Sequence, residues 1–160
     1  MSAVRRIGVI SDTHGLMRPA ALRELAGVEQ IVHAGDVGTM DVLEALRRIA
    51  PVVAVRGNVD TAPGCRELPP TAELRLGGAA VLVLHVLDEL DLDPAAAGYA
   101  AVIYGHTHEP SIRRRRGVLY LNPGSAGPRR FRLPISLALL EIGVGGGVEA
   151  RLVALTDPTT

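Results

Sequence analysis

The sequence predicts a mixed α/β sandwich of two β-sheets, on the strength of two observations. Strand and helix signals alternate along the first third of the chain, whereas the remainder is a series of buried strands and hairpins. The alternation predicts parallel strands joined by right-handed crossovers. The hairpins predict antiparallel pairing, which a single Rossmann sheet would not contain. At 160 residues the chain is expected to form one domain spanning 1–160.

The first third predicts a β-α-β-α-β series. Its three strands are the apolar runs RRIGVIS, EQIVHAG and PVVAVRG, at residues 5–11, 29–35 and 51–57. The segment 18–27 predicts the first helix, because Pro19 suits a first helical turn and Gly27 suits a helix end. The segment 39–50 predicts the second helix, with apolar residues at helical spacing and Thr39 as its N-cap.

The remainder of the chain predicts strands and turns. Residues 72–85 read as two strands around a Gly-Gly turn, and residues 99–105 as a buried strand. Residues 111–122 predict a hairpin that turns near Gly117, and residues 134–155 a final hairpin with a glycine-rich turn. The proline-rich stretch 60–73 is expected to be a surface loop.

Composition excludes several classes of protein. With 48% hydrophobic and 21% charged residues, the chain is not expected to be disordered. Its apolar runs are shorter than the roughly 18 residues that a membrane span needs. The formal net charge of zero gives no electrostatic indication of nucleic acid. Cys65 is the only cysteine, so no internal disulfide can form, and a reducing cytoplasm is the expected location.

Five of the predicted strands end in side chains that can bind a metal. These residues are Asp12, His14, Asp36, Asn58, His85, His106 and His108. Ligands of open α/β sheets bind beyond the carboxyl ends of the strands, where these seven groups are expected to converge. A mixed oxygen and nitrogen set suits Mn, Fe, Co, Ni or Zn. Seven ligands are more than one ion takes while leaving room for water. The count therefore predicts two ions, with Asp36 as the bridging carboxylate.

Each of these residues alone would more often be a turn or capping residue than a ligand, so the prediction depends on their joint pattern. His33 differs, because it lies inside its apolar run, three residues before Asp36. We interpret His33 as a packed histidine that could orient a ligand.

Short motifs resemble those of a known superfamily. The motifs are DTH at 12–14, GD at 35–36, GN at 57–58, the isolated His85, and GHTH at 105–108. In this order they resemble the signature blocks of the calcineurin-like metallophosphoesterases. The stretches HAGDV, RGNVD and LNPGS further resemble the small bacterial and archaeal phosphodiesterases, the YfcE/MJ0936-like group.

The resemblance implies a four-layer α-β-β-α sandwich with a dinuclear metal site. By matching motifs, one ion would be held by Asp12, His14, Asp36 and His108, and the other by Asp36, Asn58, His85 and His106. Two divalent transition-metal ions, with manganese first and Fe, Ni, Co or Zn as alternatives, would then hydrolyse a small phosphodiester. A hydroxide bridging the ions would attack phosphorus in line. Asp36, Asn58 and His85 would be the catalytic ligands of this centre.

The sequence departs from the superfamily pattern after the GN asparagine. Many members have a histidine there that resembles a general acid, whereas this chain has Val59. Because valine cannot transfer a proton, we expect a preference for esters with acidic leaving groups, such as aryl phosphates. The sequence does not indicate which group, if any, replaces the histidine. In the fourth block, Val86 stands where the family has glycine.

Other polar residues have less defined roles. Ser125 lacks the strand-to-helix turn of a hydrolase nucleophile and is expected to shape a turn. Arg129 and Arg130 follow that turn and are candidate substrate ligands, because guanidinium groups bind phosphate bidentately. Arg113–Arg116 are expected to form a solvated strand edge, with a phosphate-binding patch as the alternative.

Two further functions stay open from the sequence. A non-catalytic scaffold of the same fold is one, and a phosphomonoesterase or nucleotidase is the other. The complete set of seven ligands favours an enzyme over a scaffold. No aromatic platform for bases is evident among three Tyr and one Phe, so a nucleic-acid partner is not indicated. Proteins that the chain resembles are often dimers or larger, so a homo-oligomer such as a dimer is one option, and the sequence leaves the oligomeric state open.

Overall fold

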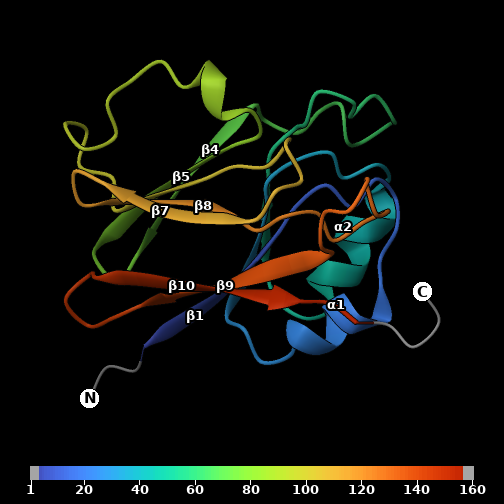
Figure 1. Ribbon diagram of the computed structural model, residues 1–160, viewed down its shortest axis with the longest axis horizontal. Helices are drawn as coiled ribbons and strands as arrows, with labels where there is room; N and C mark the ends of the chain where they lie inside the picture. The colour runs from blue at the N-terminus through green and yellow to red at the C-terminus, as the bar shows by residue number, and fades with distance from the viewer. Residues whose placement is uncertain (1–3, 157–160) are drawn as a thin grey trace.

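Two five-stranded β-sheets lie face to face in the computed structural model, which describes residues 4–156 (Figure 1). The ends of the expected domain, residues 1–3 and 157–160, fall outside the described residues. The strand order is β10-β9-β1-β2-β3 in the first sheet and β4-β5-β6-β8-β7 in the second. The predicted sandwich of two mixed sheets is therefore confirmed.

The first sheet combines the β-α-β-α-β series with the last hairpin. Its elements are β1 (Arg5–Ile10), α1 (Pro19–Glu24), β2 (Gln30–His33), α2 (Met40–Arg47), β3 (Val52–Ala54), β9 (Ser136–Ile142) and β10 (Val148–Ala154). Strands β1, β2 and β3 are parallel, and β9 joins β1 in antiparallel register. Thr39 is the N-cap residue of α2, as predicted, but its side chain makes no capping hydrogen bond.

The second sheet is built entirely from the middle of the chain. Its elements are β4 (Thr71–Leu76), β5 (Ala79–Leu84), the 3₁₀ turn η1 (Leu87–Glu89), β6 (Ala101–Ile103), β7 (Ser111–Arg115) and β8 (Val118–Asn122). Two antiparallel hairpins, β4–β5 and β7–β8, flank the short strand β6. Because β6 pairs in parallel with both β5 and β8, the carboxyl ends of β5 and β6 lie at the same edge.

Three apolar clusters hold these layers together. Ile7, Val81 and Leu121 belong to the core between the two sheets. On the outer face of the first sheet, Leu25 beside α1 and Leu43 of α2 pack in a second core. The outer face of the second sheet is covered by η1 and the coil around Tyr99, so the fourth layer is thin (Figure 1).

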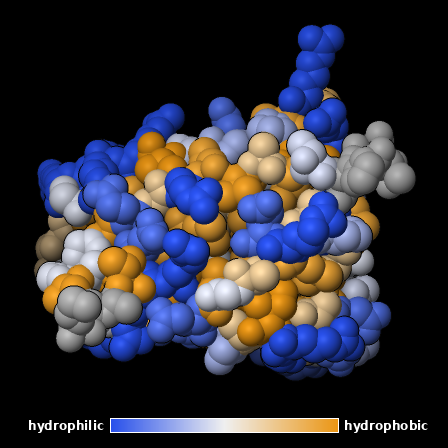
Figure 2. Space-filling view, turned by 90° about the horizontal axis from the view of Figure 1, so that it is seen from below, coloured by the Kyte–Doolittle hydropathy of each residue, from blue (hydrophilic) through white to orange (hydrophobic). Residues whose placement is uncertain are grey.

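The surface is mixed in character. Seen from below, hydrophobic residues are interspersed with hydrophilic ones (Figure 2). Within residues 4–156, no helix has the length and apolar character needed to cross a membrane.

Candidate metal centre

The seven predicted ligands lie in loops that follow β1, β2, β3, β5 and β6. Parallel pairing sends β1, β2 and β3 to one edge of the first sheet, and β5 and β6 to one edge of the second. The loops of the two sheets meet there, because the His85 ring lies 3.1 Å from the Asp36 carboxylate. The loops that carry the strand-end donors therefore meet at one shared edge of the sandwich.

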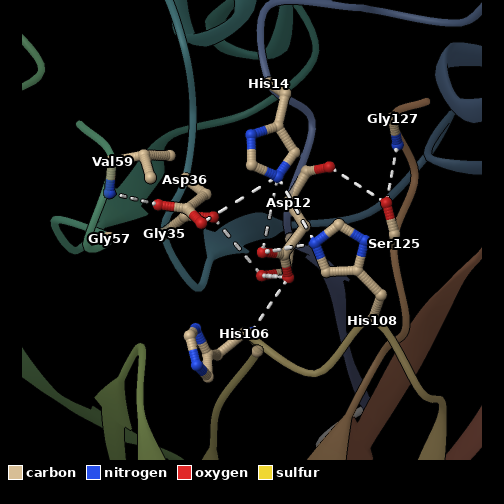
Figure 3. Close-up of polar contacts among 12 residues, drawn as sticks. Asp12, His14, Gly35, Asp36, Gly57, Val59, His106, His108, Ser125 and Gly127 are labelled. Atoms are coloured by element: carbon tan, nitrogen blue, oxygen red, sulfur yellow. Dashed lines mark hydrogen bonds and ion pairs between the residues drawn. The ribbon is translucent and has the colours of Figure 1, made fainter. Parts of the chain in front are cut away.

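One group of donors consists of Asp12, His14 and His108 (Figure 3). The Nε2 atoms of His14 and His108 are 3.3 Å apart, and His108 Nε2 lies 3.3 Å from Asp12 Oδ1. His14 Nε2 lies 3.9 Å from the same oxygen. Bonds of about 2.1 Å to a common ion place neighbouring donors roughly 3.0–3.4 Å apart. Two of the three separations fall in this range, so the group has the size of a metal site.

A second group consists of Asp12, Asp36 and His85. His85 Nε2 lies 3.1 Å from Asp36 Oδ2 and 3.8 Å from Asp12 Oδ1. Asp36 Oδ2 is also 3.9 Å from His14 Nε2, in the first group. The sequence predicts Asp36 as the bridging carboxylate, whereas in the structure Asp12 belongs to both donor groups and Asp36 also lies near a histidine of each. Asp12 makes the shortest carboxylate contact to a histidine of the first group, at 3.3 Å from His108, whereas Asp36 lies 3.9 Å from His14.

Unpartnered buried atoms indicate that this cluster suits a cation. Among the described residues, Asp12 Oδ1, His85 Nε2 and His108 Nδ1 are buried without a hydrogen-bond partner. A buried polar atom without a partner is costly, and a buried carboxylate oxygen more so. Two of these three atoms, Asp12 Oδ1 and His85 Nε2, belong to the second donor group and lie 3.8 Å apart. A divalent transition metal would satisfy both.

Asn58 and His106 lie at the exposed rim of this centre. The ring of His106 is directed away from Asp12 (Figure 3). Its Nδ1 lies 3.2 Å from Asn58 Oδ1. The backbone N–H of His106 donates to Asp12 Oδ2 at 3.2 Å, and its ring packs edge-on against His85, with centroids 5.4 Å apart. Both residues are next to the second group, but they contact each other rather than its carboxylates.

The protein fixes the orientation of the inner donors through hydrogen bonds. Ser11 Oγ donates to Asp12 Oδ2 at 2.7 Å, and the backbone N–H of Val59 donates to Asp36 Oδ1 at 3.0 Å. His85 Nδ1 lies 2.7 Å from the carbonyl oxygen of Ala34. A proton on Nδ1 makes that contact a hydrogen bond and leaves Nε2 free as the ligand atom. Each carboxylate therefore keeps one oxygen free toward the centre.

His33 links two of the ligand loops from behind. It is fully buried, and its Nδ1 accepts a hydrogen bond of 3.1 Å from the backbone N–H of Gly35. Its Nε2 lies 2.9 Å from Thr13 Oγ1, which donates to the carbonyl of Val37. An accepting Nδ1 requires the neutral tautomer with the proton on Nε2. Burial lowers the pKa of His33 from 6.5 to about 4, although Asp12 and Asp60 oppose this effect. The predicted packed role is confirmed.

Five of the seven residues have a left-handed backbone. Their φ angles are 56° at Asp12, 47° at His14, 56° at Asp36, 75° at His106 and 64° at His108. This region is uncommon for residues other than glycine, and strained residues of this kind cluster at functional sites. The fold therefore holds these loops in conformations that local preference alone would not select.

The carboxylates also shift the protonation of the inner donors. Burial alone would lower the pKa of His85, but its contact with Asp36 and the charge of Asp12 raise it above the ordinary value. Burial would likewise raise the pKa of Asp36, but His85 and the N–H of Val59 lower it. Without a metal, the centre therefore favours a cation at His85 beside an ionised Asp36.

Asp60 is a supporting residue whose full role the sequence did not reveal. Its carboxylate accepts hydrogen bonds from the backbone N–H groups of Gly57, at 2.7 Å, and Gly38, at 3.1 Å. It therefore joins the loops that carry Asp36 and Asn58. Ser125, expected to shape a turn, donates to the carbonyl of Asp12 at 3.0 Å. The only sequence signal for these contacts is their proximity to the motifs.

The remaining candidates lie further out. Arg129 and Arg130 are exposed in the loop that follows Gly127. In the arginine strand, Arg114 bonds to the carbonyl of Val148 and lies 3.4 Å from Glu149, so it ties β7 to β10. A cavity of about 410 Å³ beside His106 has a mixed lining, which includes Val86, Leu87, Tyr104, Glu109 and Arg113. Its walls could accommodate one ester group of a substrate.

Carboxylates and imidazoles gathered in this way are typical of metal-dependent hydrolases. More specifically, the chain belongs to the calcineurin-like phosphoesterase superfamily, whose domain matches residues 6–145. This match confirms the resemblance drawn from the motifs. It also makes the chain a member of a hydrolytic metallophosphoesterase family.

Relatives and solved structures agree with this assignment. The chain is 35% identical to the probable metallophosphoesterase MJ0623 of Methanocaldococcus jannaschii, over 94% of this chain and 82% of that protein. It is 29% identical to the phosphodiesterase YfcE of Escherichia coli K12, over 92% and 90% of the two chains. The structure of vacuolar protein sorting 29 from Cryptosporidium parvum superposes with a TM-score of 0.80 at 22% identity, covering 98% and 94%. This last likeness concerns the fold.

Proposed function

We propose that the protein is a dinuclear metal-dependent phosphodiesterase acting on small phosphodiesters. The first ion would be held by Asp12, His14, Asp36 and His108, and the second by Asp36, Asn58, His85 and His106. The observation that carries the proposal is the pair of buried, unpartnered atoms Asp12 Oδ1 and His85 Nε2 among the converging donors. For His106 and Asn58 to ligate the second ion, they would exchange their mutual contact for the metal.

The residues of the chain act by holding donors in place. Ser11 and the N–H of His106 fix one oxygen of Asp12, while the N–H of Val59 fixes one oxygen of Asp36. The free oxygens then point to the centre without further rearrangement. Two bound cations would supply a hydroxide nucleophile at neutral pH and offset phosphoryl charge. No side-chain nucleophile is needed, because Ser125 is buried and donates to Asp12's carbonyl.

Manganese is the first choice for the ions, with Fe, Ni, Co and Zn as alternatives. The donors are carboxylate, amide and imidazole, which suit these metals better than Ca or Mg alone. The only thiol, Cys65, is buried in the core next to α2 and is not a donor here. A cytoplasmic location agrees with that free thiol. A homodimer stays a prediction.

The test is hydrolysis by the purified full chain loaded with each metal in turn. We expect bis(p-nitrophenyl) phosphate to be cleaved faster than p-nitrophenyl phosphate, most readily with Mn. The Asp12→Asn variant should lose at least 100-fold in kcat, whereas the matched surface variant Asp91→Asn should not change. Metal content of both variants, measured by mass spectrometry, separates lost binding from lost turnover.

Several outcomes would count against the proposal. Faster cleavage of the monoester would favour a phosphomonoesterase. Absence of turnover with every metal, despite two ions bound per chain, would favour a scaffold of the same fold.

A further inference from the structure

A surface loop beside the metal centre carries an unusual aromatic residue. The segment Arg129, Arg130, Phe131 and Arg132, called here the RRFR loop, is exposed throughout. Phe131 is the only phenylalanine of the chain, and 88% of it is exposed. Phenylalanine normally contributes its large apolar surface to a core or an interface. Exposure alone does not indicate a ligand, but Phe131 is the most exposed of the large hydrophobic residues that the structure describes, and its surroundings add to the argument.

The backbone of the loop holds Phe131 in this position. Its φ angle is 54°, in the left-handed region, where a bulky residue is a genuine outlier. The N–H of Leu133 donates to the carbonyl of Arg130 at 3.1 Å, which closes a turn around Phe131, and the N–H of Ser136 donates to the carbonyl of Ser125 at 2.9 Å, which joins the segments on either side of the loop. Strain of this kind persists where the surrounding structure enforces it, often at ligand-binding sites.

The charge around Phe131 favours an anionic ligand. No Asp or Glu occurs between Glu109 and Glu141, although the whole chain has a net charge of zero. Within the described part of the chain, the arginines of the RRFR loop form no ion pair with a carboxylate. Three unpaired guanidinium groups beside an aromatic ring suit a ligand with both phosphate and a flat apolar group.

The loop starts at the metal centre itself. A Cβ atom on Gly127 would lie 2.5 Å from the carbonyl oxygen of Asp12, so the two backbones are in direct contact. Ser125 and Gly127 lie beside His108 in Figure 3. Four residues span at most about 14 Å, so Phe131 is within reach of a dinucleotide whose phosphate lies at the centre.

We propose that the RRFR loop is a nucleotide subsite, in which Phe131 stacks on a base and the arginines hold a flanking phosphate. This inference rests on the proposed phosphodiesterase function and names its substrate class: phosphodiesters that contain a nucleoside. The sequence alone indicated no aromatic platform for bases, and the exposure of Phe131 supplies one. Base stacking tolerates all bases, so the subsite would not read sequence.

Two esters with the same leaving group test the subsite. The probes are thymidine 5′-(p-nitrophenyl) phosphate and methyl p-nitrophenyl phosphate, assayed with the metal-loaded full chain. We expect the ratio of their kcat/KM values to fall roughly 5- to 100-fold in Phe131→Ala, because stacking on the base is lost. Phe131→Tyr should restore the ratio. Val144→Ala, a matched change at another exposed apolar residue, should leave it as in the wild type.

A binding measurement keeps this inference separate from the proposed function. Fluorescence anisotropy would compare labelled tetrathymidylate with an abasic tetramer of equal length, using EDTA-treated full chain at 50 and 200 mM salt. We expect tighter binding of tetrathymidylate, weakened by Phe131→Ala and, for both probes, by Arg130→Ala and by salt. Phe131→Gly, which suits the left-handed backbone, should lose base-dependent binding without a lower Tm.

The outcomes divide clearly. Equal binding of the two tetramers, together with an ester ratio that Phe131→Ala does not change, would overturn the subsite. Hydrolysis of both esters would still support the proposed phosphodiesterase function in that case. Base-dependent binding without hydrolysis of any ester would uphold the subsite and overturn the phosphodiesterase. Binding of phosphatidylserine vesicles or polyglutamate through Phe131, without base-dependent binding, would assign the loop to a membrane or an acidic protein and overturn the inference.

Discussion

By the motif resemblance, Val59 stands at the position where many members of the superfamily have a histidine. Its backbone N–H holds Asp36, and half of its side chain is exposed. A longer side chain can therefore be placed there without disturbing the core. We expect Val59→His to raise kcat for alkyl-ester leaving groups about 10- to 100-fold, because it adds a general acid. Rates for p-nitrophenyl leaving groups should change little, since these leave without a proton.

Steady-state assays of the variant with an alkyl and an aryl diester check this expectation. Val144→His, a histidine at a distant exposed position, is the matched control. An equal rise for both leaving groups would show that the new histidine acts by binding substrate rather than by transferring a proton.

His33 predicts a pH dependence of stability. In the folded protein it stays neutral down to about pH 4, whereas the unfolded chain binds its proton below about pH 6.5. Between these values the unfolded state holds more protons, so the free energy of unfolding falls as the pH drops from 6.5 to 4. Above pH 6.5 this group has no effect. The loss between pH 7.5 and 5 should be about 2 kcal/mol.

Urea unfolding of metal-free wild type and His33→Gln at these two pH values measures this loss. Glutamine can keep the contact with Thr13 but cannot titrate. The variant should show a loss smaller by about 2 kcal/mol. Parallel curves for the two proteins would assign the acid sensitivity to other groups.

Residue-level prediction from the sequence had a clear limit. Motif order and strand ends were enough to gather the donors, because the carboxyl ends of parallel strands share an edge. Contacts between loops of the two sheets, such as the carbonyl of Ala34 holding His85, depend on how the sheets dock. The sequence carries no local signal for that docking. For the same reason, the mutual contact of Asn58 and His106 could not be foreseen.

At the level of elements, the loop after β3 fits tightly against the loop after β2. A Cβ atom on Gly57 would lie 2.1 Å from Asp36 Oδ1 and 2.2 Å from the Asp36 nitrogen. Any larger residue must therefore displace Asp36. We expect Gly57→Ala to weaken metal binding 10- to 100-fold, the usual effect of disturbing groups that orient ligands.

Competition with a chromophoric chelator measures this affinity. The matched control is Gly147→Ala in the β9–β10 turn, where an added Cβ meets nothing within 4 Å. Wild-type affinity in Gly57→Ala would show that Asp36 can move without cost.

The elements themselves were largely predictable. Hydrophobic periodicity and glycine turns located the two helices of the first sheet and the hairpins of the second. The thin outer layer was not predictable, because η1 and the coil around Tyr99 show no apolar periodicity of their own. They are held by packing on the second sheet. Strand order within that sheet likewise depends on tertiary contacts.

Considered as a whole molecule, the protein should gain stability from metal. The buried atoms Asp12 Oδ1 and His85 Nε2 have no hydrogen-bond partner, and both would gain a ligand bond when a cation binds to the folded chain. At a free ion concentration of 100 times Kd, binding adds about 2.7 kcal/mol. For a chain of this size we expect manganese to raise Tm by roughly 5–10 °C over EDTA-treated protein.

Differential scanning calorimetry with and without EDTA measures the shift. In Asp12→Asn the shift should nearly disappear, and magnesium should produce a smaller one than manganese. A shift of wild-type size in the variant would place the stabilising ion somewhere else.

The two sheets bring different chemistry to their shared edge. Both aspartates, Asn58 and His14 follow strands of the first sheet, whereas the second sheet, which comes from one continuous segment, contributes only the histidines His85, His106 and His108. A cation bound there would cross-link the two sheets, which are otherwise joined by apolar packing. Exchange of the backbone amide hydrogens at the carboxyl ends of β2 and β5 should therefore slow together when metal is added, because one ion would restrain both sheets.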